Sequence, residues 1–140
     1  MKKISYSRQH INKDDIEAVK KVLKSDFITQ GPCTIAFEDK VKKFTGAKHA
    51  VAVNSATSAL HIACIALGLK KNDILWTSAN TFVASANCAL YCGAKIDLVD
   101  IDPETFNINV NVLEKKLILA KKKKYFTKDF SSCSIWRFIL

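Results

Sequence analysis

The sequence contains little glycine and proline and has no long hydrophobic run. Four glycines and two prolines occur among the 140 residues. No Gly-x-Gly-x-x-Gly follows an apolar segment, which argues against a Rossmann-type dinucleotide site. No apolar run reaches the length of a membrane-spanning helix, and the start of the chain lacks the hydrophobic region of a signal peptide. We therefore expect a cytoplasmic protein.

Acidic residues are also few, with 13 Asp and Glu against 22 Lys and Arg and a net charge of +9. More than half of this excess, a net +5, lies in residues 121–140, which begin with four consecutive lysines. Basic tails can bind polyanions. The rest of the chain has no basic stripe with interleaved aromatic residues, so nucleic-acid binding is only a weak alternative.

The five cysteines do not form a pattern typical of a metal site. Cys64, Cys88 and Cys92 lie in apolar stretches of expected helix, where a free cysteine behaves as a small hydrophobic residue. No neighbouring group of Cys or His completes a set of metal ligands. We therefore expect these thiols to pack in the core and predict no metal.

Strands and helices are expected to alternate from residue 49 onward, after two amphipathic helices. The expected helices cover residues 13–25, 55–68, 81–92 and 110–120, together with a segment that carries Phe37, Val41 and Phe44 and ends at Gly46; the expected strands cover residues 49–53, 74–76 and 95–100. This alternation with short connections predicts an α/β fold with a parallel sheet covered by helices. The helix at 55–68 is apolar on almost every side and should be buried.

The run Asn54-Ser55-Ala56-Thr57-Ser58-Ala59-Leu60 is the strongest candidate for a binding site. It follows the expected strand at 49–53 and opens a helix. The first turn of a helix has free backbone N–H groups and the positive end of the helix dipole, which together can hold a phosphate. The simpler interpretation is an ordinary capped helix, because Asn and Ser are common N-cap residues.

Four stretches in order resemble the DegT/DnrJ/EryC1/StrS family of sugar aminotransferases, which depend on pyridoxal 5′-phosphate. They are Phe27-Ile28-Thr29-Gln30-Gly31-Pro32, the run from Asn54 to Leu60, Thr81-Phe82-Val83-Ala84-Ser85-Ala86-Asn87, and Gly93-Ala94 leading into Val99-Asp100-Ile101-Asp102. The opening Ile4-Ser5-Tyr6-Ser7 is similar to that of family members that aminate a UDP-linked 4-keto-6-deoxy amino sugar in pseudaminic acid biosynthesis.

The resemblance implies roles for individual residues. Ala56 and Thr57 would bind the cofactor phosphate, with Ser55 beside them, and Phe82 would stack on the pyridine ring. Without the resemblance, Phe82 would be taken as a core residue on a buried helix. Tyr6 and Gln30 match positions near the family's sugar-nucleotide channel. The family also implies a homodimer and an amino donor, usually glutamate.

The resemblance also implies that important parts are missing. The lysine that bonds to the cofactor and the carboxylate at its ring nitrogen lie well beyond residue 118 in the family, so no catalytic residue is assigned here. We expect residues 1–118 to be a truncated part of the fold-type I large domain, in which the three expected strands do not all pair. Exposed strand edges and apolar faces would then favour aggregation or proteolysis.

Residues 119–140 are interpreted as a basic tail without family character. The change in character falls at the lysine run Lys121–Lys124, and the working hypothesis is a shift of the reading frame there. The alternative function is a small phosphate- or polyanion-binding module that uses the helix start at 55–57 and this tail.

Overall fold

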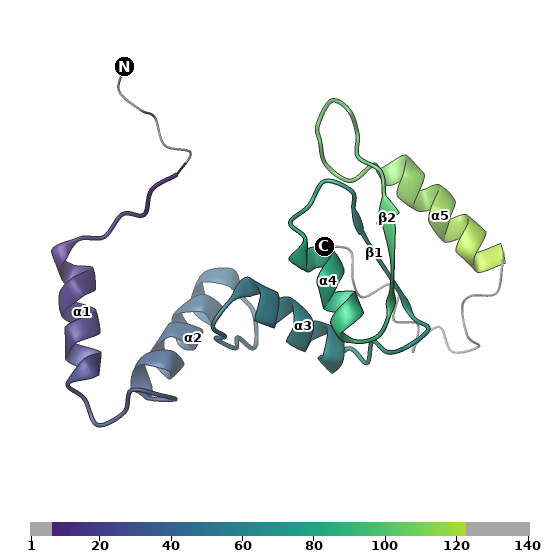
Figure 1. Ribbon diagram of the computed structural model, residues 1–140. Helices are drawn as coiled ribbons and strands as arrows, with labels where there is room; N and C mark the ends of the chain where they lie inside the picture. The colour runs from purple at the N-terminus through teal and green to yellow at the C-terminus, as the bar shows by residue number, and fades with distance from the viewer. Residues whose placement is uncertain (1–6, 123–140) are drawn as a thin grey trace, which may run out of the picture. The chain divides into compact units, whose positions relative to one another are not determined.

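The computed structural model describes residues 7–122, which fall into two compact units that divide after Ala52. The first unit contains helices α1 (Lys13–Leu23) and α2 (Pro32–Thr45), and the second contains α3 (Ala56–Ala66), β1 (Ile74–Ser78), α4 (Ala84–Tyr91), β2 (Lys95–Val99) and α5 (Val110–Lys122). Figure 1 shows the elements in chain order. No helix of the described residues has the length and apolar character needed to cross a membrane.

Helix α1 begins at the expected residue and ends two residues earlier than the expected 25, and α2 ends at Gly46 as expected. The Asn12 side chain accepts hydrogen bonds from the backbone N–H groups of Asp14 and Asp15, and the Asp15 carboxylate accepts one from the Asn12 N–H, which forms a capping box at the start of α1. Helix α2 begins at Pro32, whose missing N–H costs nothing at a first helical position. It ends at Gly46, which has a φ of 75°.

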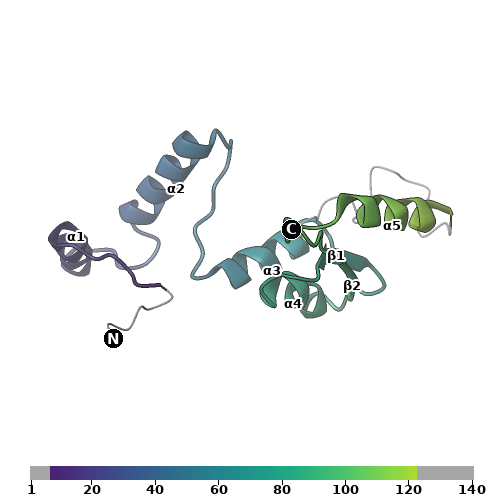
Figure 2. The same ribbon diagram turned by 90° about the horizontal axis from the view of Figure 1, so that it is seen from above.

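The second unit is built on a parallel pair of strands, as expected for an α/β fold. Within the described residues, β1 pairs with β2 in a register that joins Ile74 to Lys95 and Ser78 to Val99. Helix α4, with α3 beside it, packs on one face of this pair, and α5 packs on the other, as Figures 1 and 2 show. The parallel sheet covered by helices is therefore confirmed in this unit.

Two core clusters follow from the alternation of side chains along β1. The Leu75 side chain joins the cluster under α3 and α4, and the Trp76 side chain joins the cluster under α5. The first cluster contains the buried residues Cys64, Leu69, Leu75, Cys88, Ala89 and Ala94, and the second contains Trp76, Val99, Leu113 and Ala120. The prediction that Cys64 and Cys88 pack in the core is confirmed, because neither is exposed to solvent.

The thiols of the first cluster lie close enough to affect one another. Burial raises the pKa of the Cys64 thiol from 9.0 to about 12, and the neighbouring thiols of Cys88 and Cys92 contribute to the shift. All three are free thiols. The described residues contain no group of three or more Cys, His, Asp or Glu side chains arranged to hold a metal ion.

The strand expected at residues 49–53 does not form, which corrects that prediction. Within the described residues, the segment forms no regular secondary structure and pairs with no strand. A hydrogen bond of 2.8 Å joins the Ala52 N–H to the Glu38 carboxylate of α2. Val51 is 77% exposed. An apolar sequence is not sufficient for a strand, because the backbone of a strand needs a partner.

The expectation that the helix at 55–68 is buried is also wrong in this chain. Helix α3 is shorter than expected, and among its residues only Cys64 is buried. Ile62 and Ile65 are 50% and 58% exposed. The apolar composition of α3 is adapted to a covered position, and within the second unit α4 packs against one side of it.

Candidate functional site

The candidate site is centred on the turn that opens α3. Ser55 is the N-cap residue, with the extended backbone (φ −159°, ψ 157°) typical of that position. Its Oγ accepts a hydrogen bond of 3.2 Å from the Ser58 N–H. This satisfies one of the N–H groups that every helix start leaves without an intrahelical partner.

The hydroxyl groups of this turn form a short chain of hydrogen bonds. The Ser58 hydroxyl donates to Asn54 Oδ1 at 2.7 Å, and Ser55 Oγ lies 3.0 Å from Ser58 Oγ. Because the Ser58 proton is directed at Asn54, the Ser55 hydroxyl is the donor in the second contact. Its proton and one lone pair are therefore used within the turn. The hydrogen bonds favour a capping role for Ser55 over a direct role as an anion ligand.

The donors left for an anion are those of the next two residues. Among the described residues, no hydrogen-bond partner is present for the backbone N–H of Ala56 or of Thr57, or for the Thr57 hydroxyl. Ala56 is exposed and Thr57 is half-buried, so a ligand can reach both. Two adjacent N–H donors at the positive end of a helix, with a hydroxyl beside them, suit a phosphate group.

Phe82 lies in the connection that leaves β1 and leads into α4, and not on the helix where it was expected. Helix α4 begins at Ala84, and the Phe82 carbonyl accepts a hydrogen bond of 3.0 Å from the Ser85 N–H. Phe82 is 74% exposed, so it is not a buried core residue within the described part of the chain. An exposed ring whose backbone is fixed by the start of a helix is available to stack on a planar ligand.

The two parts of the site belong to helices that contact each other. Helices α3 and α4 lie side by side in Figures 1 and 2. The rings of His61 and Tyr91 meet at a centroid distance of 5.2 Å in an edge-to-face arrangement, and Cys64 and Cys88 pack in the same cluster. These contacts join the middle of α3 to the later part of α4 and do not themselves bring the Ser55–Thr57 turn to the Phe82 loop.

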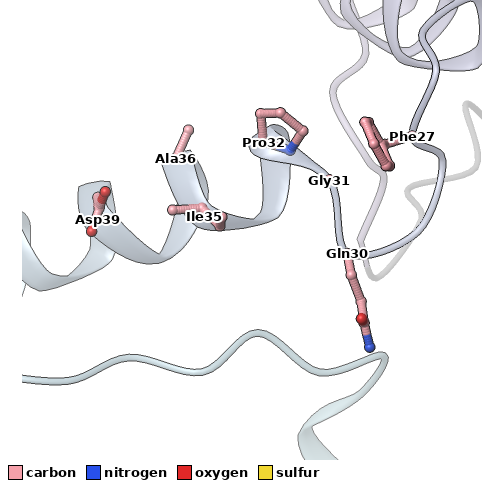
Figure 3. Close-up of a pocket in the computed structure, with 7 residues that line it drawn as sticks. All are labelled: Phe27, Gln30, Gly31, Pro32, Ile35, Ala36 and Asp39. Atoms are coloured by element: carbon pink, nitrogen blue, oxygen red, sulfur yellow. The ribbon is translucent and has the colours of Figure 1, made fainter.

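Gln30 lies in the first unit, in the loop before α2. Its backbone is in the left-handed region with a φ of 51°, an uncommon conformation that is often found at functional sites. It lines a shallow hollow of about 340 Å³ together with Phe27, Gly31, Pro32, Ile35, Ala36 and Asp39. Figure 3 shows the Gln30 side chain directed away from Pro32 and Ile35. Tyr6 lies outside the described residues.

Gly31 allows the loop before α2 to pass close to Phe27. A Cβ atom at this position would come within 2.9 Å of both the Cβ and the carbonyl oxygen of Phe27. Such contacts are too short for any side chain, so only glycine lets the two residues meet. The available sequence signal was the Gly31-Pro32 pair, which appeared above only within a stretch that carries the family resemblance.

Asn54 and Ser58 were not assigned separate roles from the sequence, although both lie in the run that was singled out. Their hydrogen bond of 2.7 Å holds the turn in place. The available sequence signal for this bond was an Asn followed four residues later by a Ser at a helix start. Both side chains are short enough to form hydrogen bonds within the turn.

Comparison with known proteins shows that most of the chain matches one protein family. Residues 9–124 match the model of the DegT/DnrJ/EryC1/StrS aminotransferase family. A UDP-4-amino-4,6-dideoxy-N-acetyl-beta-L-altrosamine transaminase of Campylobacter jejuni subsp. jejuni serotype O:23/36 is 44% identical over 115 residues, which are 82% of this chain and 30% of the relative. The spore coat polysaccharide biosynthesis protein SpsC of Bacillus subtilis is 41% identical over 79% of this chain and 28% of its own length.

Solved structures give the same result. The PMP form of Spr1654 from Streptococcus pneumoniae, named as a sugar aminotransferase, is similar with a TM-score of 0.78 and 32% identity, over 81% of this chain and 28% of that chain. Helicobacter pylori PseC, an aminotransferase involved in pseudaminic acid biosynthesis, is similar with a TM-score of 0.73 and 35% identity, over 81% and 31%. This chain therefore spans about 30% of the length of the relatives that it matches.

Proposed function

Because the chain belongs to the DegT/DnrJ/EryC1/StrS aminotransferase family, we propose that it supplies the cofactor-phosphate site of a nucleotide-sugar transaminase. Its fold is that of the N-terminal part of the fold-type I large domain, in truncated form. The aminotransferases of this family use pyridoxal 5′-phosphate. The observation that carries the proposal is the pair of free N–H donors at Ala56 and Thr57.

The residues present fit the phosphate end of this cofactor. A phosphate dianion accepts charge-assisted hydrogen bonds, which are stronger than bonds between neutral groups. The N–H groups of Ala56 and Thr57 and the Thr57 hydroxyl would bind it, while the capping bonds of Ser55 orient the turn. When bound, the cofactor supplies an electron sink for amino-group transfer. Phe82 would hold its ring, because the side chain is exposed on the loop before α4.

The substrate is proposed from the relatives. The Campylobacter jejuni relative is named as a transaminase for a UDP-linked amino sugar. We therefore infer a UDP-linked 4-keto-6-deoxy amino sugar as the acceptor, with glutamate as the amino donor and a homodimer as the assembly. Gln30 and Tyr6 are the residues proposed to face the sugar nucleotide. The cytoplasmic location expected from the sequence remains a prediction.

We infer that the 140-residue chain is inactive by itself. The relatives are about three times as long, and the lysine and carboxylate that the chemistry needs are expected in the part that this chain does not match. Without a lysine bonded to the cofactor, proton transfer during transamination has no catalyst. The chain would bind the cofactor through its phosphate and carry out no turnover.

The test combines binding, trapping and turnover on the purified chain. Pyridoxal phosphate should bind, and pyridoxal, which lacks the phosphate, should bind much more weakly. Borohydride reduction followed by peptide mass spectrometry should find no single modified lysine, and no amino sugar should form from a UDP-linked 4-keto sugar and glutamate. Turnover, or one specifically modified lysine, would overturn the inactive assignment. Equal binding of pyridoxal would overturn the phosphate site.

A further inference from the structure

The turn before α3 contains side-chain hydrogen bonds that capping of the helix does not require. Ser55 alone acts as the cap, because its Oγ accepts from the Ser58 N–H. The other two bonds join side chains only: the Ser58 hydroxyl donates to Asn54 Oδ1 at 2.7 Å, and Ser55 Oγ lies 3.0 Å from Ser58 Oγ. Neither bond satisfies a backbone group of α3. Fixing exposed side chains costs conformational entropy, so these two bonds call for a role other than capping.

Asparagine is used differently at the starts of α1 and α5. Asn12 accepts hydrogen bonds from the second and third N–H groups of α1, and Asn109 does the same for α5. At α3 the third N–H alone is bonded, to Ser55, and the Asn54 oxygen accepts from the Ser58 hydroxyl instead. The first two N–H groups of α3, which are the proposed phosphate donors, are thus left open.

The Asn54 oxygen fixes the direction of the hydroxyl chain. An amide oxygen only accepts, so it draws the Ser58 proton toward itself, and the Ser55 hydroxyl then donates to Ser58 Oγ. Without this oxygen, the Ser58 proton could turn toward Ser55 Oγ, and the Ser55 hydroxyl would rotate freely. The chain would then have two directions, and the cap would no longer be held in one geometry.

We propose that Asn54 is a positioning residue of the phosphate site and that it acts through Ser58. By holding the Ser55 cap in one orientation, it keeps the N–H groups of Ala56 and Thr57 in a fixed direction for the phosphate. This inference rests on the proposed function, because it requires that a phosphate bind at the start of α3. It adds a residue that does not itself contact the phosphate.

The test begins with Asn54→Ala in the full chain. Calorimetric titration should show weaker binding of both pyridoxal phosphate and inorganic phosphate by about threefold to tenfold, the range expected for loss of one neutral hydrogen bond. Asn109→Ala is the matched control. It removes the capping oxygen of α5, so it should lower stability in urea but leave phosphate binding unchanged. Circular dichroism establishes that each variant is folded.

Two substitutions of Ser58 test whether Asn54 acts through the Ser58 hydroxyl. Ser58→Thr keeps the hydroxyl, and Ser58→Ala removes it. Asn54→Ala should weaken phosphate binding in the Ser58→Thr background as it does in the wild type, and it should have no further effect in the Ser58→Ala background. A residue with a merely structural role would have the same effect in both backgrounds, and that result would overturn the proposal.

Deuterium exchange of the unliganded chain provides an independent measurement. The Ser58 amide should exchange about threefold faster in Asn54→Ala, because the Ser55 oxygen that accepts from it is no longer held. If Asn54→Ala bound phosphate as tightly as the wild type, or if this exchange were unchanged, the positioning role would be wrong and the proposed function would stand. If the wild-type chain bound neither pyridoxal phosphate nor inorganic phosphate, the proposed function would fail and the positioning role with it.

Discussion

Replacing Ser55 by aspartate should make the chain more stable than Ser55→Ala and should weaken its binding of phosphate. Ser55→Ala removes the oxygen that accepts from the Ser58 N–H at 3.2 Å and that lies 3.0 Å from the Ser58 hydroxyl. Loss of an N-cap oxygen costs about 1 kcal/mol of folding free energy. Ser55→Asp keeps an acceptor at the cap and adds a negative charge at the positive end of α3. It should be more stable than Ser55→Ala by about 1 to 2 kcal/mol.

Phosphate binding should respond in the other direction. The added carboxylate lies next to the Ala56 and Thr57 N–H groups, where a phosphate would sit, and like charges at close range repel strongly. We expect Ser55→Asp to weaken the binding of pyridoxal phosphate by at least about tenfold, which corresponds to about 1.4 kcal/mol. A site elsewhere on the chain would not be affected in this way.

The assays are urea unfolding followed by circular dichroism and calorimetric titration with pyridoxal phosphate. Ser25→Asp is the matched control, because Ser25 follows the end of α1 and its hydroxyl donates to the Val22 carbonyl. This control should leave phosphate binding unchanged. If Ser55→Asp bound the cofactor as tightly as the wild type, the phosphate would not lie at the start of α3. If Ser55→Ala were as stable as the wild type, the capping bonds would not exist in solution.

Three further substitutions test the packing. Leu75→Ala should destabilise the second unit by about 2 to 5 kcal/mol, because Leu75 is 2% exposed in the core under α3 and α4; a loss under 1 kcal/mol in urea unfolding would contradict that core. Gly31→Ala should destabilise the first unit by about 1 to 3 kcal/mol, because the new Cβ would lie 2.9 Å from Phe27 atoms; unchanged deuterium exchange in α1 and α2 would contradict the close approach. Stability should fall as the pH rises from 9 toward 12, because the Cys64 thiol ionises at its ordinary pKa of 9.0 when unfolded and at about 12 when folded. Cys64→Ala should reduce this dependence, and an unchanged slope would contradict the burial of the thiol.

Local signals in the sequence predicted the helix ends to within about three residues. Asn12 caps the helix expected from residue 13, and the positive-φ glycines 46, 68 and 93 follow within two residues of the ends of α2, α3 and α4, because a cap depends on residues within one turn. The predicted strands at 74–76 and 95–100 also form, each within a residue or two of the expected bounds. Each has a neighbour in this chain with which to pair.

Features that depend on distant partners could not be predicted in the same way. Residues 49–53 have the composition of a strand, but a strand forms only when another backbone satisfies its hydrogen bonds. The burial of α3 was predicted from composition, which reflects the environment of the helix in a larger fold and not in this chain. For Phe82, the sequence left open whether the ring was buried, and the exposed loop position decided the question.

The most direct test of the account is nuclear magnetic resonance of the isotope-labelled chain during titration with pyridoxal phosphate. The account predicts that the backbone amide signals of Ala56 and Thr57 move most, that inorganic phosphate moves the same signals, and that pyridoxal without phosphate does not. Largest shifts elsewhere, or equal shifts with pyridoxal, would contradict the central claim that the start of α3 holds the cofactor phosphate.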